Sequence, residues 1–155
     1  LILSFFLISN VFSAGSSGSD SGKTKTDYDK AVSHINLAKK YEKKNKSEKA
    51  NKKYEKALKL LLKSNIEKPN SADTLNYLGF TTRKLGDFVN GEKYYLQGLA
   101  IDPNHKGINE YLGELYVATN RIELAKERLN ILSGCNCDEY KQLKEIIEGT
   151  KKSKY

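Results

Sequence analysis

The chain has 155 residues, of which 38% are hydrophobic and 30% charged, and its formal net charge is +8. These values describe a polar globular chain about one domain long, and they exclude collagen-like, low-complexity and mainly membrane-spanning proteins. The positive excess lies in the first half, because residues 1–70 hold 15 lysines against 7 acidic residues. With two prolines, no tryptophan and no methionine among many lysines and leucines, the composition favours long helices over a turn-rich sheet protein.

Residues 1–12, LILSFFLISNVF, are apolar but too few to span a bilayer comfortably, and they match the hydrophobic centre of a secretory signal. The small residues Ser13, Ala14 and Gly15 follow, and they suit cleavage after Ser13 or Gly15. We therefore predict a signal peptide over residues 1–14 whose charged first residues are missing, with an uncleaved membrane anchor as the alternative. Residues 15–26, GSSGSDSGKTKT, have little to bury and predict a flexible Gly/Ser linker.

From Asp27 onward, apolar residues recur at helical spacing, and whole segments recur at a longer interval. The second and third segments are offset by 34 residues throughout, and Pro69 and Pro103 share that offset. The aligned positions are Leu37, Ala38, Tyr41, Ala50, Tyr54 and Ala57 in the first segment, Leu78, Gly79, Thr82, Gly91, Tyr95 and Gly98 in the second, and Leu112, Gly113, Tyr116, Ala125, Leu129 and Leu132 in the third.

This pattern resembles the tetratricopeptide repeat (TPR), with Thr82, Gly91 and Cys137 as departures from its usual Tyr, Ala and Pro. The resemblance covers about residues 31–137 and implies an all-α fold, an α-α superhelix or TPR solenoid of about three helical hairpins. The expected repeats span about 31–70, 72–105 and 106–137 within a domain of residues 27–150. A capping helix is expected at 138–149, followed by a frayed tail at 151–155.

The repeats also predict local details. The first repeat is offset from the second by 41 residues, so seven extra residues should lengthen its second helix by two turns. Asn45, Gly86 and Asn120 stand at one turn position and tolerate the left-handed conformation that ends a helix. Ser47 and Asp87 are the predicted caps of the helices that follow. Small residues such as Gly91 and Gly98 should let the paired helices approach closely.

The TPR resemblance also implies a binding surface, because stacked repeats of this family typically present their first helices on a concave face that receives a peptide or partner protein. The corresponding positions here are Lys39, Glu42, Lys43, Asn76, Tyr77, Phe80, Arg83, Lys84, Glu110, Tyr111 and Glu114. The alternative is that Tyr77 and Phe80 pack between neighbouring repeats. The Lys, Asn and Arg set with which some members grip a C-terminal carboxylate is missing, since Ile35 and Tyr111 stand at two of its positions. A chaperone-tail adaptor is therefore disfavoured.

Cys135 and Cys137 are the only cysteines, and in an exported chain such a pair is more often oxidised than free. A ring across the single residue Asn136 is strained, so a free dithiol or a bond to another molecule stays open. The pair resembles the cysteines before an acidic-Glu-Tyr segment in small exported bacterial repeat proteins. Only His34 and His105 could supplement it, and zinc wants about four such ligands. Since no catalytic motif is present, we predict neither enzyme activity nor a metal or cofactor.

Eleven lysines between Lys39 and Lys63 face only three glutamates, and this run is either a solvated helix face or a surface for anions. It contains no arginine, and its tyrosines fall at core spacing, which makes nucleic acid an unlikely partner. We predict an exported TPR scaffold, in a bacterial periplasm, that binds a peptide or protein in its groove. The alternative is a peripheral electrostatic binder of anionic membrane, envelope polymer or nucleic acid through Lys39–Lys63.

Overall fold

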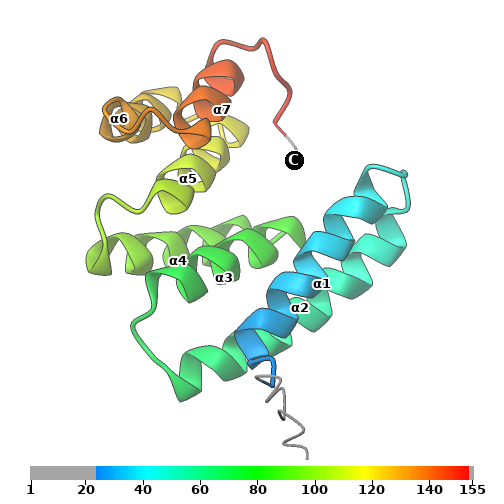
Figure 1. Cartoon of the computed structure of the whole chain (residues 1–155). Coiled ribbons are helices and arrows are strands. Elements are labelled where there is room, and N and C mark those ends of the chain that lie inside the picture. The colour runs from blue at the N-terminus through cyan, green and yellow to red at the C-terminus, as the bar shows by residue number, and fades with distance from the viewer. Residues whose placement is uncertain (1–23, 154–155) are drawn as a thin grey trace, which may run out of the picture.

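A computed structural model describes residues 24–153, and within that range the chain forms seven helices and no strand (Figure 1). This confirms the predicted all-α class. The signal peptide and most of the linker predicted for residues 1–26 lie outside the described residues, as do residues 154 and 155. The helices are α1 (Asp27–Glu42), α2 (Ser47–Glu67), α3 (Ala72–Lys84), α4 (Phe88–Ile101), α5 (Lys106–Ala118), α6 (Ile122–Leu132) and α7 (Asp138–Ile147).

A side chain caps the start of four helices, α1, α3, α4 and α5. Thr26 forms a capping box with Asp29, whose backbone N–H donates to the Thr26 hydroxyl at 3.1 Å. Asp87 caps α4 as predicted, since its carboxylate accepts from the Asn90 N–H at 3.0 Å. The prediction for Ser47 was wrong: Lys46 precedes α2, and no side chain caps that helix.

The turns inside the hairpins have the backbone that their residues predict. Asn45, Gly86 and Asn120 all have positive φ, at 55°, 95° and 58°. Such a residue ends one helix and lets the next run back along it. Pro69 and Pro103 lie two residues beyond the ends of α2 and α4, where they cannot interrupt a helix.

Three helical hairpins stack in chain order to form an α-α superhelix (Figure 1). Helix α1 pairs with α2, α3 with α4, and α5 with α6, while α2 packs on α3 and α4 on α5. Helix α7 covers the last hairpin by packing on both α5 and α6, with Leu143 and Ile146 buried there. Because α1 and α5 both contact α3, the first helices of the hairpins share one side of the stack.

The close approach of the helices depends on small residues. A Cβ added to Gly91 would lie 3.1 Å from the Gly79 carbonyl oxygen, and one added to Gly98 would overlap the Ile108 side chain. The prediction of close packing at these two glycines is confirmed. Helix α2 is 21 residues long against 14 for α4, and the seven additional residues match the seven in the sequence offset. The end of α2 therefore projects past the second hairpin, at the bottom of Figure 1.

Candidate functional site

Helices α1, α3 and α5 meet around the side chain of Phe80, on the side where the binding groove was predicted. Phe80 lies on α3 and is 3% exposed. Its ring centroid is 5.0 Å from that of Tyr111 on α5 and 5.9 Å from that of Tyr54 on α2. The Lys39 ammonium on α1 lies 4.5 Å above the Phe80 ring and 3.4 Å from the Tyr111 hydroxyl, which places a cation over the aromatic cluster. We call Lys39, Tyr54, Phe80 and Tyr111 the central cluster.

A buried ion pair joins α3 to α5 beside the central cluster. The Arg83 guanidinium lies 3.2 Å from the Glu114 carboxylate and donates to the Tyr111 carbonyl oxygen at 2.6 Å. The side chains of Arg83 and Glu114 are 0% and 1% exposed. Burial raises the pKa of the Tyr111 phenol above its ordinary value, and the neighbouring Glu110 raises it further. The buried Arg83–Glu114 ion pair thus connects the second and third hairpins in a place that is closed to solvent.

A second ion pair connects the first two hairpins near the surface. The Lys84 ammonium lies 2.5 Å from the Glu42 carboxylate, which also accepts from the Tyr54 hydroxyl at 3.0 Å. Burial raises the pKa of Tyr54, and the carboxylate of Glu42 adds to that rise because it disfavours a second negative charge. These contacts give Lys84 and Glu42 a structural role that their positions in the repeat do not reveal.

The predicted groove residues therefore divide into two groups. The first group is buried, and these residues reach a partner only if the hairpins part: Asn76, Phe80, Arg83, Glu110 and Glu114. This burial arises because α1 and α5 both close over α3, and a role for these residues in binding a partner stays a prediction. The second group keeps part of its surface exposed: Lys39, Glu42, Lys43, Tyr77, Lys84 and Tyr111. Binding of a partner by these residues stays a prediction.

Tyr77 packs at the edge of this surface against Tyr28, a residue that the repeat pattern did not single out. Their ring centroids are 5.9 Å apart. Burial raises the pKa of Tyr28 to about 12. This contact between neighbouring hairpins matches the alternative in which Tyr77 packs between repeats.

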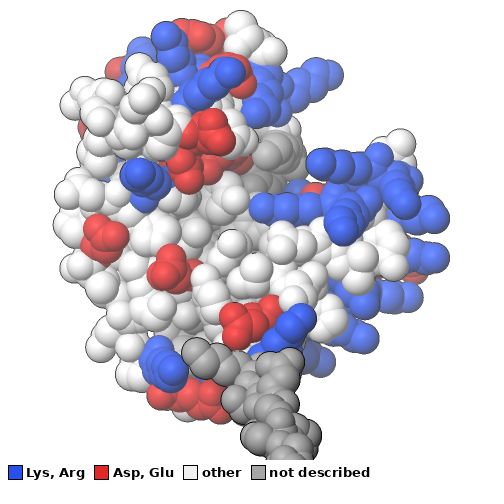
Figure 2. Space-filling view, in the orientation of Figure 1, with Lys and Arg blue, Asp and Glu red and all other residues white. Residues whose placement is uncertain are grey.

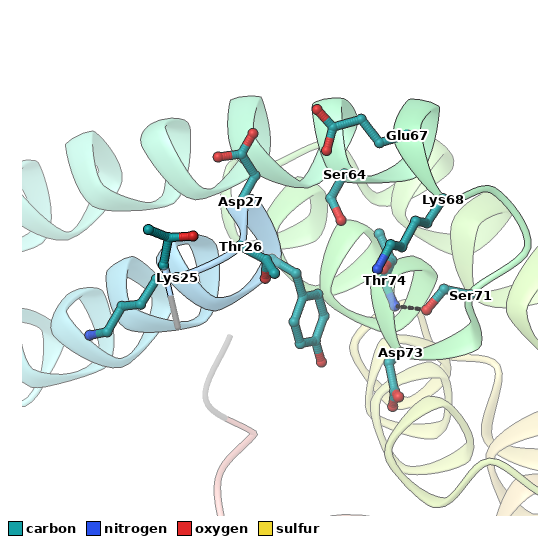
Figure 3. Close-up of a pocket in the computed structure, with 11 residues that line it drawn as sticks. Lys25, Thr26, Asp27, Ser64, Glu67, Lys68, Ser71, Asp73 and Thr74 are labelled. Carbon is teal, nitrogen blue, oxygen red and sulfur yellow. Dashed lines mark hydrogen bonds between the residues drawn. The ribbon is translucent and has the colours of Figure 1, made fainter. Parts of the chain in front are cut away.

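A pocket of about 460 Å³ lies where the start of α1, the end of α2 and the start of α3 come together (Figure 3). Thr26 and Asp27 lie on one side of it, and Ser71 and Asp73 on the other. The Ser71 hydroxyl accepts from the Thr74 N–H at 3.2 Å and so caps α3. Sequence reasoning missed this pocket because its walls come from three separate segments. Its lining carries side chains of both charges and several hydroxyl groups.

Part of the lysine run forms a continuous basic surface on α2. Five of its lysines line a second pocket of about 340 Å³ together with Tyr41 and Glu55, and none of the five is ion-paired with a carboxylate of the described residues. In Figure 2 the blue side chains crowd the right-hand side, over α1 and α2, with little red among them. Burial lowers the pKa of His34 on α1, and Lys53 and Lys56 lower it further. We call this surface the lysine face: Lys49, Lys52, Lys53, Lys56 and Lys59.

The two cysteines and His105 serve local structure. Cys135 and Cys137 form a disulfide in the turn between α6 and α7, and Asn136 between them has a φ of 45°. His105 caps α5 by accepting from the Ile108 N–H at 3.1 Å, and its other ring nitrogen lies 3.0 Å from Asp73. Across residues 24–153, no group of three or more His, Cys, Asp or Glu side chains is placed to hold a metal ion. No helix within that range combines the length and apolar character needed to cross a membrane.

No protein-family model matches the chain, and no curated protein matches it. Among solved structures it is similar to the first TPR domain of Spaghetti (RPAP3), determined with the HSP90 peptide SRMEEVD bound. The TM-score is 0.56 at 19% sequence identity, and the match covers 81% of this chain and 95% of that one. The fold is a TPR superhelix. At this level of identity the likeness establishes the fold and does not show what this chain binds.

Proposed function

We propose that this TPR superhelix is a non-enzymatic protein-interaction module that binds an extended peptide or protein segment along the side formed by α1, α3 and α5. The observation that carries the proposal is the stacking of three hairpins with their first helices on one side, where Lys39, Tyr77 and Tyr111 keep exposed surface. The similar TPR domain of Spaghetti was solved with a peptide bound, which supports the same use of the fold.

The side chains that remain accessible favour an acidic peptide. Lys39 lies in the last turn of α1, and Lys43, four residues on, is the residue that ends this helix and keeps helical φ and ψ, so the two lie on one face. Lys43 is exposed, and the Lys39 ammonium sits over the Phe80 and Tyr111 rings. A carboxylate beside Lys39 would meet a cation held in place by aromatic rings, so little ordering entropy would be lost on binding. Ile35 stands where some TPR domains carry a carboxylate-binding lysine, so we propose recognition of an internal acidic segment.

Selection from a random peptide library tests this function, with the full chain immobilised. We expect wild-type protein to enrich related acidic peptides, and the double substitution Lys39→Gln, Lys43→Gln to weaken their affinity about ten-fold or more, which is about 1.4 kcal/mol or more. Lys52→Gln, Lys56→Gln on α2 is the matched control, because it removes the same charge from a different surface. We expect that control to change the peptide Kd less than two-fold.

Two outcomes would contradict the proposal. Enrichment of no peptide family by wild-type protein would show that this side is not a peptide site. An equal loss of affinity in both double variants would show attraction by net charge alone. Circular dichroism at 222 nm checks that both variants remain helical, so that neither result reflects unfolding.

We also propose that the module is exported, as the apolar residues 1–12 and the oxidised Cys135–Cys137 pair favour. Expression of the full chain in a bacterial host, followed by cell fractionation and mass spectrometry, tests this. Export predicts mature protein in the periplasmic fraction with its first residue near Ala14. Intact chain in the cytoplasm with free thiols would contradict it.

A further inference from the structure

The two additional turns of α2 expose apolar side chains that the hairpin stack does not use. Ile66 is 81% exposed and Leu62 is 40% exposed, and Ile66 is the most exposed large hydrophobic side chain among the described residues. Both lie in the part of the helix that the other hairpins lack, since α4 is seven residues shorter. Exposing an isoleucine has a free-energy cost that burial against another surface would remove.

These apolar residues lie on the same face of α2 as part of the lysine run. Lys59, Leu62, Lys63 and Ile66 stand at spacings of three, four and seven residues, which places them side by side on a helix. Lys52 and Lys56 continue the same row toward the start of the helix, at four-residue and three-residue steps. Lysine side chains can extend their charge past neighbouring apolar groups. One face of α2 therefore combines several lysines, with the carboxylate of Glu55 among them, and exposed Leu and Ile.

The described part of the chain begins next to this face. The Lys63 ammonium lies 2.7 Å from the Asp27 carboxylate at the start of α1, and Thr24 and Lys25 line the same pocket as Ser64 and Lys68 of α2. The apolar residues 1–12 precede Thr24 by eleven residues, which reach at most about 40 Å when fully extended. Where this segment is retained as an uncleaved anchor instead of being removed, it would keep Thr24, which lies beside the end of α2, within that distance of the lipid headgroups.

We propose that the lysine row and the exposed Leu62 and Ile66 of α2 form a docking surface for a bilayer rich in anionic lipids. Interfacial helices have this combination, in which lysines meet anionic headgroups while apolar side chains enter the boundary of the acyl region. A soluble linear polyanion would need only the charges. A nucleic acid typically binds arginines and exposed aromatic rings, and α2 has no arginine and only the buried Tyr54. The proposal is independent of the peptide site, which lies on the other helices.

Vesicle co-sedimentation of the full chain tests the proposal. The vesicles are pure phosphatidylcholine or phosphatidylcholine with 30% phosphatidylglycerol. Any insertion of residues 1–12 occurs in both, so the measured quantity is the ratio of the two partition coefficients. We expect wild-type protein to prefer the anionic vesicles at least ten-fold at low salt and to lose most of that preference in 0.5 M salt. Lys52→Gln, Lys56→Gln, Lys59→Gln should lower partition onto anionic vesicles about 10- to 100-fold.

Two further variants separate this surface from net charge and from other ligands. Lys93→Gln, Lys106→Gln, Lys141→Gln removes three exposed lysines elsewhere and should change partition less than two-fold. Leu62→Ser, Ile66→Ser leaves the charge unchanged and should lower partition onto anionic vesicles at least five-fold, because the apolar side chains that would enter the bilayer are lost. Neither side chain is buried in the core, so the variant should remain folded.

The proposal is overturned if the anionic preference is absent, or if the two lysine triple variants lose it equally. It is also overturned if Leu62→Ser, Ile66→Ser binds like wild type while a single-stranded oligonucleotide or polyglutamate displaces the protein from vesicles, since the face would then belong to a soluble polyanion. None of these results bears on the peptide site, whose variants are on α1.

Discussion

Replacing Glu114 by glutamine should be among the most damaging single changes in the domain, because it removes the carboxylate that lies 3.2 Å from the buried Arg83 guanidinium. The two side chains are 0% and 1% exposed and 3.2 Å apart, so water cannot solvate the remaining cation. Breaking such a pair typically costs about 3–5 kcal/mol. Glutamine keeps the shape of the side chain, so the loss reports charge and hydrogen bonding. The Tyr111 carbonyl at 2.6 Å still accepts from Arg83, which favours the lower end of that range.

Urea unfolding followed by circular dichroism at 222 nm measures this cost. We expect the midpoint to fall with an unchanged slope, as for a stability change without a change in compactness. Glu123→Gln is the matched control, because it removes the same charge from an exposed ion pair with Lys126. The side chain of Glu123 is 82% exposed and that of Lys126 is 55% exposed. Exposed pairs contribute roughly 0.2–1 kcal/mol. If Glu114→Gln costs less than 1 kcal/mol, or no more than Glu123→Gln, the pair does not act as a buried ion pair and the reasoning fails.

Three more results follow from the same packing. Gly98→Val should lower the free energy of unfolding by about 1–3 kcal/mol in the same urea titration, because the new side chain overlaps the facing helix, and a variant as stable as wild type would disprove that close approach. Ser71→Ala should cost about 1 kcal/mol through the lost cap of α3 while Ser47→Ala, which removes no cap, should leave the urea midpoint unchanged; the reverse order would contradict the assigned caps. Lys63 holds the pKa of the Asp27 carboxyl below its ordinary value, so this contact stabilises the fold above the ordinary carboxyl pKa and is lost as pH falls through the lowered one. Lys63→Gln should raise that pKa in an NMR titration, and an unchanged value would exclude the ion pair in solution.

The hairpins and their turns could be predicted because the information that specifies them is local. Apolar residues at helical spacing and Asn or Gly at one turn position each act within a few residues of themselves, and the 34-residue recurrence repeats these local patterns along the chain. The seven-residue offset predicted the length of α2 for the same reason, since a two-turn insertion keeps every side chain on its face. One local prediction was wrong: Ser47 follows the cap position that Lys46 occupies, and helix boundaries shift easily by one residue.

The burial of the predicted site could not be derived from repeat positions. A position in a repeat sets the direction in which a side chain leaves its helix, but it does not determine how far neighbouring hairpins rotate toward one another. Here Lys39 on α1 reaches Tyr111 on α5, 72 residues away, and together they cover Phe80. That closure makes Phe80 and Arg83 core residues. It depends on packing between helices that are distant in the chain, so the repeat positions alone do not predict it.

By itself, the sequence determined that the chain folds into three helical hairpins with a capping helix, because each of these units is specified by contacts between residues close in the chain. Tertiary structure alone decided which side chains are exposed. It buried Arg83 against Glu114, left Ile66 in solvent beside Lys63, and brought the start of α1 to the end of α2. Exposure is a property of how the hairpins stack, and stacking angles arise from many non-local contacts at once.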